Sequence, residues 1–215
     1  MVELHLATST SESRAATVAQ LAHKIGLPQA SLARTETYKP YLLAPDGQTR
    51  GLAIAHIRGG ASPFSLMAAC TTNNIGLDAE IWPIGTGDAI FRNSIMAKDD
   101  TNLAETFCAK GLDSGLLLWV GKEAALKATG HVMVDPRDIA ITKLKQNLAS
   151  ATPSKNAQAM LPQTTLAYYT FAAPQSGETV LMAIALANAS MAAKPFRILH
   201  SAELLNFSPL NLDSP

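Results

Sequence analysis

Apolar and polar residues alternate at the start of the chain and then change to a helical period. In residues 2–7 apolar and polar positions alternate, which predicts a short β-strand with one buried face. Within residues 15–25 the apolar positions recur every three or four residues, which predicts an amphipathic helix. A hydroxyl side chain of residues 9–11 is expected to cap this helix, and the Gly-Leu-Pro sequence at 26–28 to end it. The pattern therefore predicts a strand followed by a helix.

Extended segments follow this helix. Residues 37–43 are expected to be extended, because Pro40 keeps Lys39 out of the helical region. Residues 52–57 and 64–70 are apolar runs of strand length, and the segment between them contains two glycines and a proline. This composition predicts two paired strands joined by a loop.

The next strand carries two acidic residues on one face. Four apolar residues alternate with polar ones and glycine between Asn73 and Trp82, which predicts a strand with one apolar face. Asp78 and Glu80 share the other face, roughly 7 Å apart by the rise of a strand. Two carboxylates at that separation repel each other, so they favour a bound cation, a basic partner or simple solvation. For a strand with one exposed face, solvation is the commonest of these outcomes.

A helix is predicted over residues 119–130, where strong helix formers end at a glycine. Trp119, Glu123 and Lys127 recur every fourth residue and so share one face, while Lys122 belongs to the neighbouring stripe. Glu123 followed by Lys127 is the favoured order for an ion pair along a helix, worth about 0.3–0.5 kcal/mol when exposed. This row therefore fits either an ordinary amphipathic helix or part of a site.

Helices and strands also alternate in the rest of the chain. Residues 84–118 are expected to be helical with interrupting loops, and residues 149–164 to form a loop by composition. The chain from Ala187 onward has little periodicity and is expected to pack over the surface as extended chain. The remaining strands are expected at 132–134, 138–145, 165–172 and 179–186, the last two as a hairpin.

The order of these elements predicts an α+β fold with an internal repeat. A strand, a helix and several strands occur within residues 2–72 and again within 75–187, although the two segments share little sequence. We therefore divide the chain into an N-terminal half, residues 1–72, and a C-terminal half, residues 73–215.

Composition and charge narrow the classes of function. Of 215 residues, 47% are hydrophobic and 16% charged, against about 25% charged in a typical soluble domain, which indicates a compact protein. Lys and Arg total 17, as do Asp and Glu, so no global field attracts the chain to nucleic acid or to a membrane. No apolar run reaches the roughly 18–20 residues of a membrane span, and the N-terminus lacks the pattern of a signal peptide. We expect a cytoplasmic protein in which Cys70 and Cys108 are buried free thiols.

Two motifs resemble the signatures of the 4′-phosphopantetheinyl transferase superfamily. They are Gly-Leu-Asp-Ala-Glu at 76–80 and Trp-Val-Gly-Lys-Glu-Ala-Ala-Leu-Lys-Ala-Thr-Gly at 119–130, in the family's order and spacing. Upstream, residues 38–41 resemble the family's Gly-Lys-Pro segment and residues 55–56 its Ser-His pair. Further similar segments follow in the family's C-terminal order at 168–171, 181–186 and 198–205. The chain length is similar to that of the monomeric, pseudo-dimeric type, which implies two similar α/β halves with the active site at their interface.

The resemblance implies a reaction and a set of site residues. Family members transfer the phosphopantetheine group of coenzyme A to a serine of an acyl or peptidyl carrier protein. By analogy, Asp78, Glu80 and Glu123 would hold Mg²⁺, with Mn²⁺ as the alternative ion, a choice that suits carboxylates combined with phosphate oxygens. Glu123, directly or through water, would be the base for the serine, and Lys127 would face the pyrophosphate. Lys122 would either support the site or contact a substrate phosphate.

In the family the N-terminal half holds the nucleotide end of coenzyme A. By analogy Lys39 and His56 would contact phosphates, with Arg14 as a further candidate; a structural, hydrogen-bonded role is the alternative for His56. The implied partners are coenzyme A and a carrier protein, with neither nucleic acid nor membrane, and the implied state is a monomer.

Three features depart from the family pattern. Ala55 replaces the usual serine, Gly121 replaces a larger residue, and the N-terminal half is short with few arginines. A catalytically weakened relative that binds coenzyme A or carrier proteins therefore remains an alternative. So does a structural α+β protein whose motifs match by coincidence.

Overall fold

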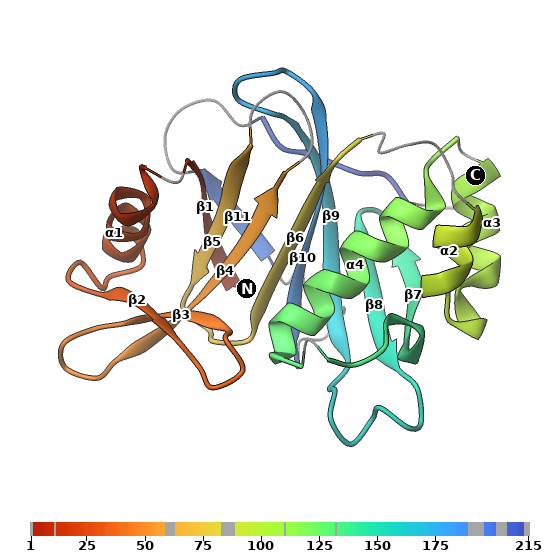
Figure 1. Cartoon of the computed structure of the whole chain (residues 1–215), viewed down its shortest axis with the longest axis horizontal. Helices are drawn as coiled ribbons and strands as arrows, with labels where there is room; N and C mark the ends of the chain where they lie inside the picture. The colour runs from red at the N-terminus through yellow and green to blue at the C-terminus, as the bar shows by residue number, and fades with distance from the viewer. Residues whose placement is uncertain are drawn as a thin grey trace.

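The computed structural model describes residues 2–10, 12–58, 63–82, 89–109, 111–131, 133–188, 196–200 and 206–212. Within these ranges the chain forms two β-sheets and four α-helices, which confirms the α+β class expected from the sequence. Figure 1 shows the sheets near the centre, with helices at both ends of the long axis. No helix in the described ranges combines the length and the apolar character needed to cross a membrane.

The first sheet contains six strands and is antiparallel except for one outer pair. β1 and β11 run parallel, so a C-terminal segment is added beside the first strand of the chain. In spatial order the strands are β11 (Phe196–His200), β1 (Val2–Ser9), β5 (Phe64–Cys70), β4 (Thr49–Ile57), β3 (Pro40–Leu43) and β2 (Ser31–Arg34).

The second sheet is antiparallel throughout. A short strand, β12 (Ser208–Pro209), pairs with β9 outside the main strand order. In spatial order the main strands are β6 (Ile75–Ile81), β10 (Thr179–Ala187), β9 (Thr164–Ala172), β8 (Leu148–Pro153) and β7 (Ile139–Lys145).

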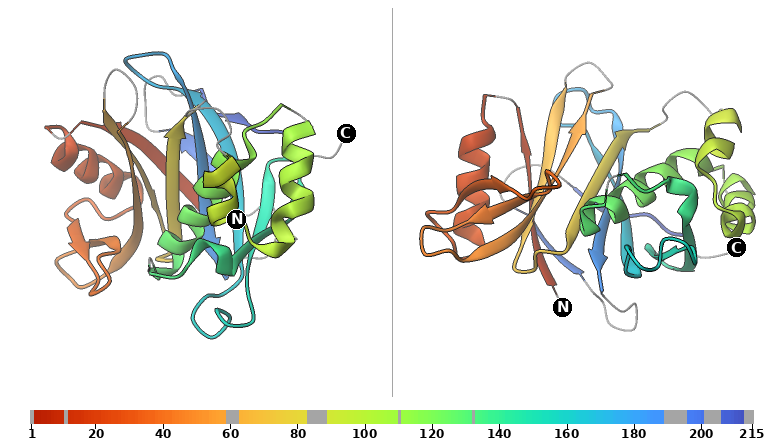
Figure 2. Two further views of the ribbon diagram at one scale, coloured as in Figure 1. Left: turned by 45° about the vertical axis from the view of Figure 1, so that its right-hand side comes forward. Right: turned by 60° about the horizontal axis from the view of Figure 1, so that its bottom comes forward.

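Helices cover the outer faces of both sheets. α1 (Arg14–Lys24) packs on the first sheet, and α4 (Ser114–Thr129) lies along the second, with α2 (Ala89–Ile95) and α3 (Thr101–Ala109) beside it (Figures 1 and 2). Two short 3₁₀ helices, η1 (Lys98–Asp100) and η2 (Pro136–Asp138), precede α3 and β7. A third apolar cluster joins the two sheets through residues such as Leu6, Ile57, Leu77 and Ile184. The alternation of strand residues explains this arrangement, because each central strand has an apolar residue for the core on either face.

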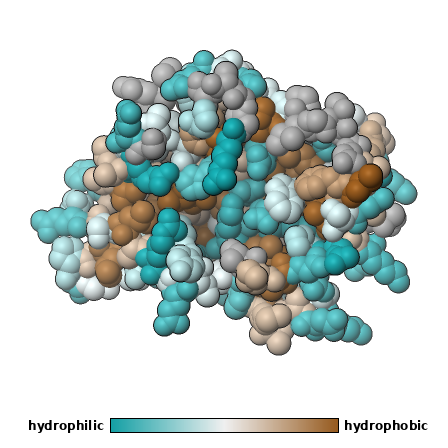
Figure 3. Space-filling view, in the orientation of Figure 1, coloured by the Kyte–Doolittle hydropathy of each residue, from teal (hydrophilic) through white to brown (hydrophobic). Residues whose placement is uncertain are grey.

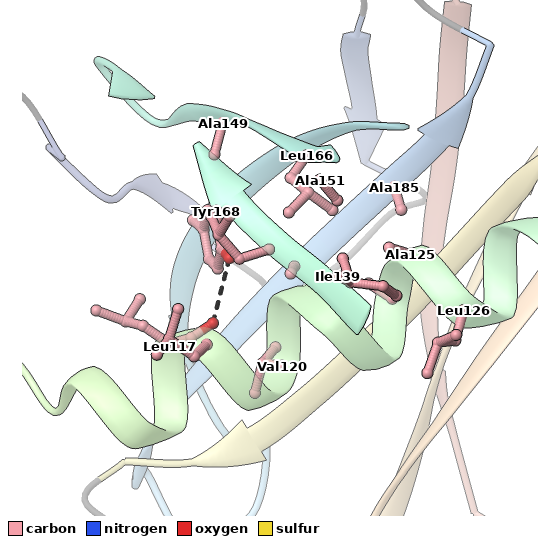
Figure 4. Packing of buried hydrophobic residues seen from close by; sticks show 14 of the residues in the cluster. Leu117, Val120, Ala125, Leu126, Ile139, Ala149, Ala151, Leu166, Tyr168 and Ala185 are labelled. Atoms are coloured by element: carbon pink, nitrogen blue, oxygen red, sulfur yellow. Dashed lines mark hydrogen bonds between the residues drawn. The ribbon is translucent and has the colours of Figure 1, made fainter. Parts of the chain in front are cut away.

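Both ends of α4 follow from its sequence. The Asp113 carboxylate accepts a hydrogen bond from the Leu116 N–H at 3.0 Å and so caps the helix. Gly130 ends the helix in the left-handed conformation at φ 79°, as predicted. The helix is buried on most sides because sheet and helices enclose it, and buried residues include Leu117, Val120 and Leu126 (Figure 4).

A glycine brings α4 into close contact with β6. A Cβ atom at Gly76 would lie 1.9 Å from the backbone oxygen of Ala124, closer than any real side chain approaches. Without a side chain at Gly76, the helix backbone packs directly on the strand. The two motifs therefore lie against each other.

Several expectations about strands are confirmed and others are wrong. β1, β4, β5, β6, β7, β9 and β10 occur where the pattern predicts them. The expected loop at 149–164 is wrong in its first part, since β8 ends only at Pro153. Ala149 and Ala151 are buried under α4, and such small residues give little hydrophobic signal in the sequence. The strand expected at 132–134 is absent at residues 133–134, which form a turn and a bend; Val132 is outside the described residues.

Three further expectations need correction. The segment after Ala187 is not only extended surface chain, because β11 pairs with β1 in the first sheet and β12 pairs with β9 in the second. α1 begins after Ser13 rather than at a cap in residues 9–11. Cys70 is buried as expected, but Cys108 is exposed.

Candidate functional site

The acidic and basic residues of the two motifs meet where α4 crosses β6. Asp78 and Glu80 come from the face of β6 that α4 covers, and Glu123 and Lys127 come from the helix. Asp78 is only 6% exposed, so the expectation of a solvated strand face is wrong at this position. The Lys127 Nζ donates to Asp78 Oδ1 at 2.5 Å, an ion pair between two elements rather than one along the helix.

The carboxylates of Asp78, Glu80 and Glu123 lie where burial disfavours their charged form. Burial raises the pKa of Asp78, and the Lys127 ammonium opposes that rise. The pKa of Glu80 is raised to about 7, first by burial and then by the charge of Asp78. Burial, followed by Asp78, also raises the pKa of Glu123. Carboxylates that raise one another's pKa favour a proton or a cation between them.

One oxygen of this cluster has no partner. Asp78 Oδ2 is buried and makes no hydrogen bond within the described structure. A buried carboxylate oxygen left without a donor is costly, and a cation is one way to satisfy it. However, no group of three or more histidine, cysteine or acidic side chains in the described ranges is arranged to hold a metal ion. The donor set therefore fits a cation in charge and chemistry, while Lys127 supplies the positive charge in the present arrangement.

A largely apolar pocket that also has basic residues in its lining opens beside this cluster. Its volume is about 240 Å³, and residues from both the N-terminal and the C-terminal half line it. Figure 3 shows hydrophobic patches among hydrophilic side chains on the face that carries β2, β3, β4 and α4. The lining residues are Arg34, Thr37, Tyr38, Lys39, Pro40, Leu52, Ala53, Ile54, His56, Ile75, Lys127 and Gly130. The pocket thus unites Lys39, His56 and Lys127, three residues that the sequence selected.

Lys39 and His56 carry shifted pKa values in this pocket. The Lys39 ammonium donates to the backbone oxygen of Ala128 at the end of α4, and burial lowers its pKa to about 8. His56 Nδ1 lies 2.8 Å from Ser65 Oγ. Burial lowers the pKa of His56 first, and the surrounding cations, led by Arg14, lower it further. His56 therefore has a structural hydrogen bond and also faces the pocket, so both roles considered for it stay open.

Lys122 lies away from the pocket and is fully buried. Its Nζ donates to the Ile95 backbone oxygen at 2.7 Å and forms an ion pair with Asp100 Oδ2. The Asp100 carboxylate also accepts backbone N–H donors from Ala97 and Ile141, each at 2.7 Å. With its ammonium held in this network, the structure favours support of α4 over phosphate contact for Lys122.

The structure shows the surroundings of Gly121 and Ala55, two positions at which the sequence differs from the motifs it resembles. A Cβ at Gly121 would lie 1.9 Å from the hydroxyl of Tyr168, so the tyrosine fills the space that a larger residue would need. The Tyr168 hydroxyl donates to the Leu117 backbone oxygen at 3.2 Å (Figure 4). Ala55 is fully buried in the cluster between the sheets and does not line the pocket.

The other selected residues lie at the margin of the site. Arg14, on α1, is half-buried and does not line the pocket, although its charge reaches His56. Trp119 is partly buried against the core under α4, with its ring 5.7 Å from that of Phe91 in an edge-to-face arrangement.

The sequence did not single out Arg34 as a pocket residue. Arg34 lines the pocket, and its guanidinium donates to the Tyr38 backbone oxygen at 3.0 Å. In the β2–β3 hairpin Arg34 pairs with Pro40, which places it beside Lys39. A strand prediction for Ser31–Arg34 would have revealed this neighbourhood, but only four residues carry the pattern.

A search of protein-family models and of curated proteins finds no match to this chain. Inferences about function therefore start from the geometry and chemistry of the site.

Proposed function

We propose that the chain transfers the 4′-phosphopantetheine group from coenzyme A to a serine of an acyl or peptidyl carrier protein. The observation that carries this proposal is the junction of Asp78, Glu80, Glu123 and Lys127 beside a pocket whose lining includes basic residues. The two motifs that resemble the transferase signatures are 49 residues apart at Asp78 and Lys127, yet the fold brings them into contact. A coincidental match of sequence patterns would not require this.

The strand order of the two sheets supports the pseudo-dimeric part of the proposal. Apart from β11 at the edge of the first sheet and β12 beside the second, each sheet has the spatial order 1-5-4-3-2 when numbered from its own first strand, as β1-β5-β4-β3-β2 and β6-β10-β9-β8-β7. In this interpretation residues 1–72 and 73–215 are two related halves, and the reaction takes place where they meet. The pocket is lined from both sides of that division.

The pocket would receive the nucleotide end of coenzyme A. Arg34, Lys39 and His56 line it, and no acidic side chain does. Guanidinium and ammonium groups are the usual partners of phosphate. The volume of about 240 Å³ lies below the roughly 300–1,000 Å³ of sites that enclose a drug-sized ligand. Only part of coenzyme A would be enclosed, and the pantetheine arm would extend outside.

The reaction is a phosphoryl-type transfer with a balanced exchange of bonds. The serine oxygen attacks the phosphorus that carries pantetheine, a new P–O bond forms, and the P–O bond within the pyrophosphate breaks. Adenosine 3′,5′-bisphosphate leaves. Glu123, directly or through water, takes the proton of the serine. Lys127 stabilises negative charge on the pyrophosphate.

Asp78, Glu80 and Glu123 would hold Mg²⁺, with Mn²⁺ as the alternative ion. The unpartnered Asp78 Oδ2 and the raised pKa values of all three carboxylates fit such a cation. When bound, the ion would neutralise charge that develops on the phosphate oxygens. The chain's own contribution is to present the carboxylates on rigid elements, β6 and α4.

The direct test is transfer to an apo carrier protein. Incubation with coenzyme A, Mg²⁺ and several apo acyl and peptidyl carriers should add the mass of one phosphopantetheine group to at least one carrier, as seen by mass spectrometry. Glu123→Gln should lower the rate by about 10²–10⁴-fold, as expected for loss of a general base. Glu105→Gln, an exposed glutamate on α3, is the matched control and should keep the wild-type rate. If no carrier gains mass, the proposal is wrong.

A weakened relative that binds coenzyme A or carriers without efficient transfer is the second candidate. The ion pair of Lys127 with Asp78 favours it, because the ammonium occupies a carboxylate that the transfer reaction would need for the metal ion. In that case coenzyme A would bind in calorimetry while the carriers stay unmodified at any Mg²⁺ or Mn²⁺ concentration.

A further inference from the structure

Lys127 belongs to two charged groups at once. On one side its ammonium is bonded to Asp78, which shares a cluster with Glu80 and Glu123. On the other side Lys127 lines the pocket together with Arg34, Lys39 and His56. Its side chain is 31% exposed, so it has room to move, whereas Asp78 is nearly fully buried.

Asp78 depends on Lys127 in the present arrangement. Oδ1 accepts from Lys127, and Oδ2 is buried with no hydrogen-bond partner. Removing the ammonium would leave a buried carboxylate without a counter-charge, which is strongly unfavourable. Lys127 can therefore turn to a phosphate in the pocket only when another cation, or a proton, satisfies Asp78 in its place.

The same constraint acts on a metal ion. A divalent cation at the Asp78 carboxylate repels the Lys127 ammonium on the neighbouring oxygen and weakens its ion pair, so the half-buried ammonium needs another partner. A phosphate in the adjoining pocket would supply that partner. Either ligand alone binds at the cost of the Lys127–Asp78 ion pair. When both ligands bind, that cost arises only once.

We propose that Lys127 exchanges its ammonium between Asp78 and a phosphate of coenzyme A, so that a divalent cation at the carboxylates and coenzyme A in the pocket bind cooperatively. This inference rests on the proposed function. Because binding linkage is reciprocal, the cation and coenzyme A raise each other's affinity by the same factor. Couplings between protein sites commonly lie at about 5–150-fold.

The first test measures Mn²⁺ alone, by electron paramagnetic resonance of the free ion, without coenzyme A. Lys127→Met removes the competing ammonium, so Mn²⁺ should bind about tenfold more tightly than to the wild type. Lys39→Met is the matched control, since Lys39 lines the same pocket but binds the Ala128 oxygen rather than a carboxylate. Its Mn²⁺ affinity should stay near that of the wild type.

The second test measures coenzyme A in the presence of a chelator, by calorimetry. Asp78→Asn keeps the size of the side chain but frees Lys127, so coenzyme A should bind about tenfold more tightly than to the wild type. Glu80→Gln removes a charge from the same cluster without a bond to Lys127 and should have a smaller effect. In the wild type, adding Mn²⁺ should raise the affinity for coenzyme A. In Lys127→Met this increase should be smaller, because only direct contact between the metal and the phosphate remains to produce it.

The outcomes separate the exchange from the proposed function. If coenzyme A and Mn²⁺ bind the wild type but Lys127→Met and Asp78→Asn leave both affinities unchanged or weaker, the exchange is wrong and the proposed function stands. If the wild type binds neither coenzyme A nor Mn²⁺, both are wrong. If Lys39→Met binds Mn²⁺ as much more tightly as Lys127→Met does, the gain comes from the loss of one positive charge at either position. That result would also overturn the exchange.

Discussion

Gly76 on β6 lies directly under the backbone oxygen of Ala124 on α4, with no room for a side chain between them. The 1.9 Å separation calculated for a Cβ at Gly76 shows how closely the strand and helix backbones approach. This contact lies two residues before Asp78 and one residue after Glu123. It therefore fixes the distance between the acidic strand and the helix that carries Lys127.

Gly76→Ala should test this contact. Forcing a methyl group between β6 and α4 is overpacking, so we expect a loss of about 1–3 kcal/mol in the free energy of unfolding, measured by urea denaturation. Gly115→Ala is the control within α4. The nearest atoms there would be 3.4 Å from the added Cβ, so the change should stay below about 1 kcal/mol. Equal stability of Gly76→Ala and the wild type would contradict the close packing.

Gly121 and Tyr168 should behave as a coupled pair. Gly121→Ala alone should be destabilising, because the new methyl group meets the Tyr168 hydroxyl. Tyr168→Phe alone should cost about 0.5–1.5 kcal/mol for the lost hydrogen bond to Leu117. In the double variant the methyl group gains room. The double variant should therefore lose less free energy of unfolding than the sum of the two single losses, by about 0.5–3 kcal/mol in a double-mutant cycle. Strict additivity would mean that the two residues do not compete for space.

Lys122→Met should separate structural support from phosphate binding. It leaves the buried Asp100 carboxylate without its counter-charge, so we expect a loss of about 3–5 kcal/mol in the free energy of unfolding. Where the variant is folded, its affinity for adenosine 3′,5′-bisphosphate should match that of the wild type. Lys155→Met, at an exposed position, should change stability by less than about 0.5 kcal/mol. A stable variant with weakened ligand binding would instead assign Lys122 to a phosphate.

The pKa of Lys39 predicts how ligand binding depends on pH. Without ligand, burial lowers the pKa of Lys39 to about 8. A bound phosphate raises that pKa because it favours the charged ammonium. The contribution of Lys39 to the affinity for adenosine 3′,5′-bisphosphate should therefore be constant below about pH 7. It should fall as pH rises through 8, by about tenfold at pH 9, in calorimetry. Lys39→Arg keeps its charge over this range, so the fall should disappear; the same fall in that variant would assign the titration to another group.

The candidate site was visible in the sequence in part. The places of Asp78 and Glu80 on one face of a strand and of Glu123 and Lys127 on one face of a helix follow from local pattern. Lys39 and His56 were selected only by the resemblance to the transferase signatures. Arg34 was not found, because four residues of β2 are too few for a periodic signal. The burial of Asp78 was not found either, because nothing within residues 73–82 shows that a helix from residues 114–129 covers that face.

What the sequence determined by itself was local. Alternating and helical periods, Gly130 as a helix end and the order of elements all depend on residues that are neighbours along the chain. The tertiary structure alone decided which partner each charged group has. Lys127 bonds to Asp78 and Lys122 to Asp100 across 49 and 22 residues of chain, and β11 joins β1 from the opposite end of the sequence. Such pairings depend on how sheets and helices pack, and the close approach at Gly76 shows that a single absent side chain can set that packing.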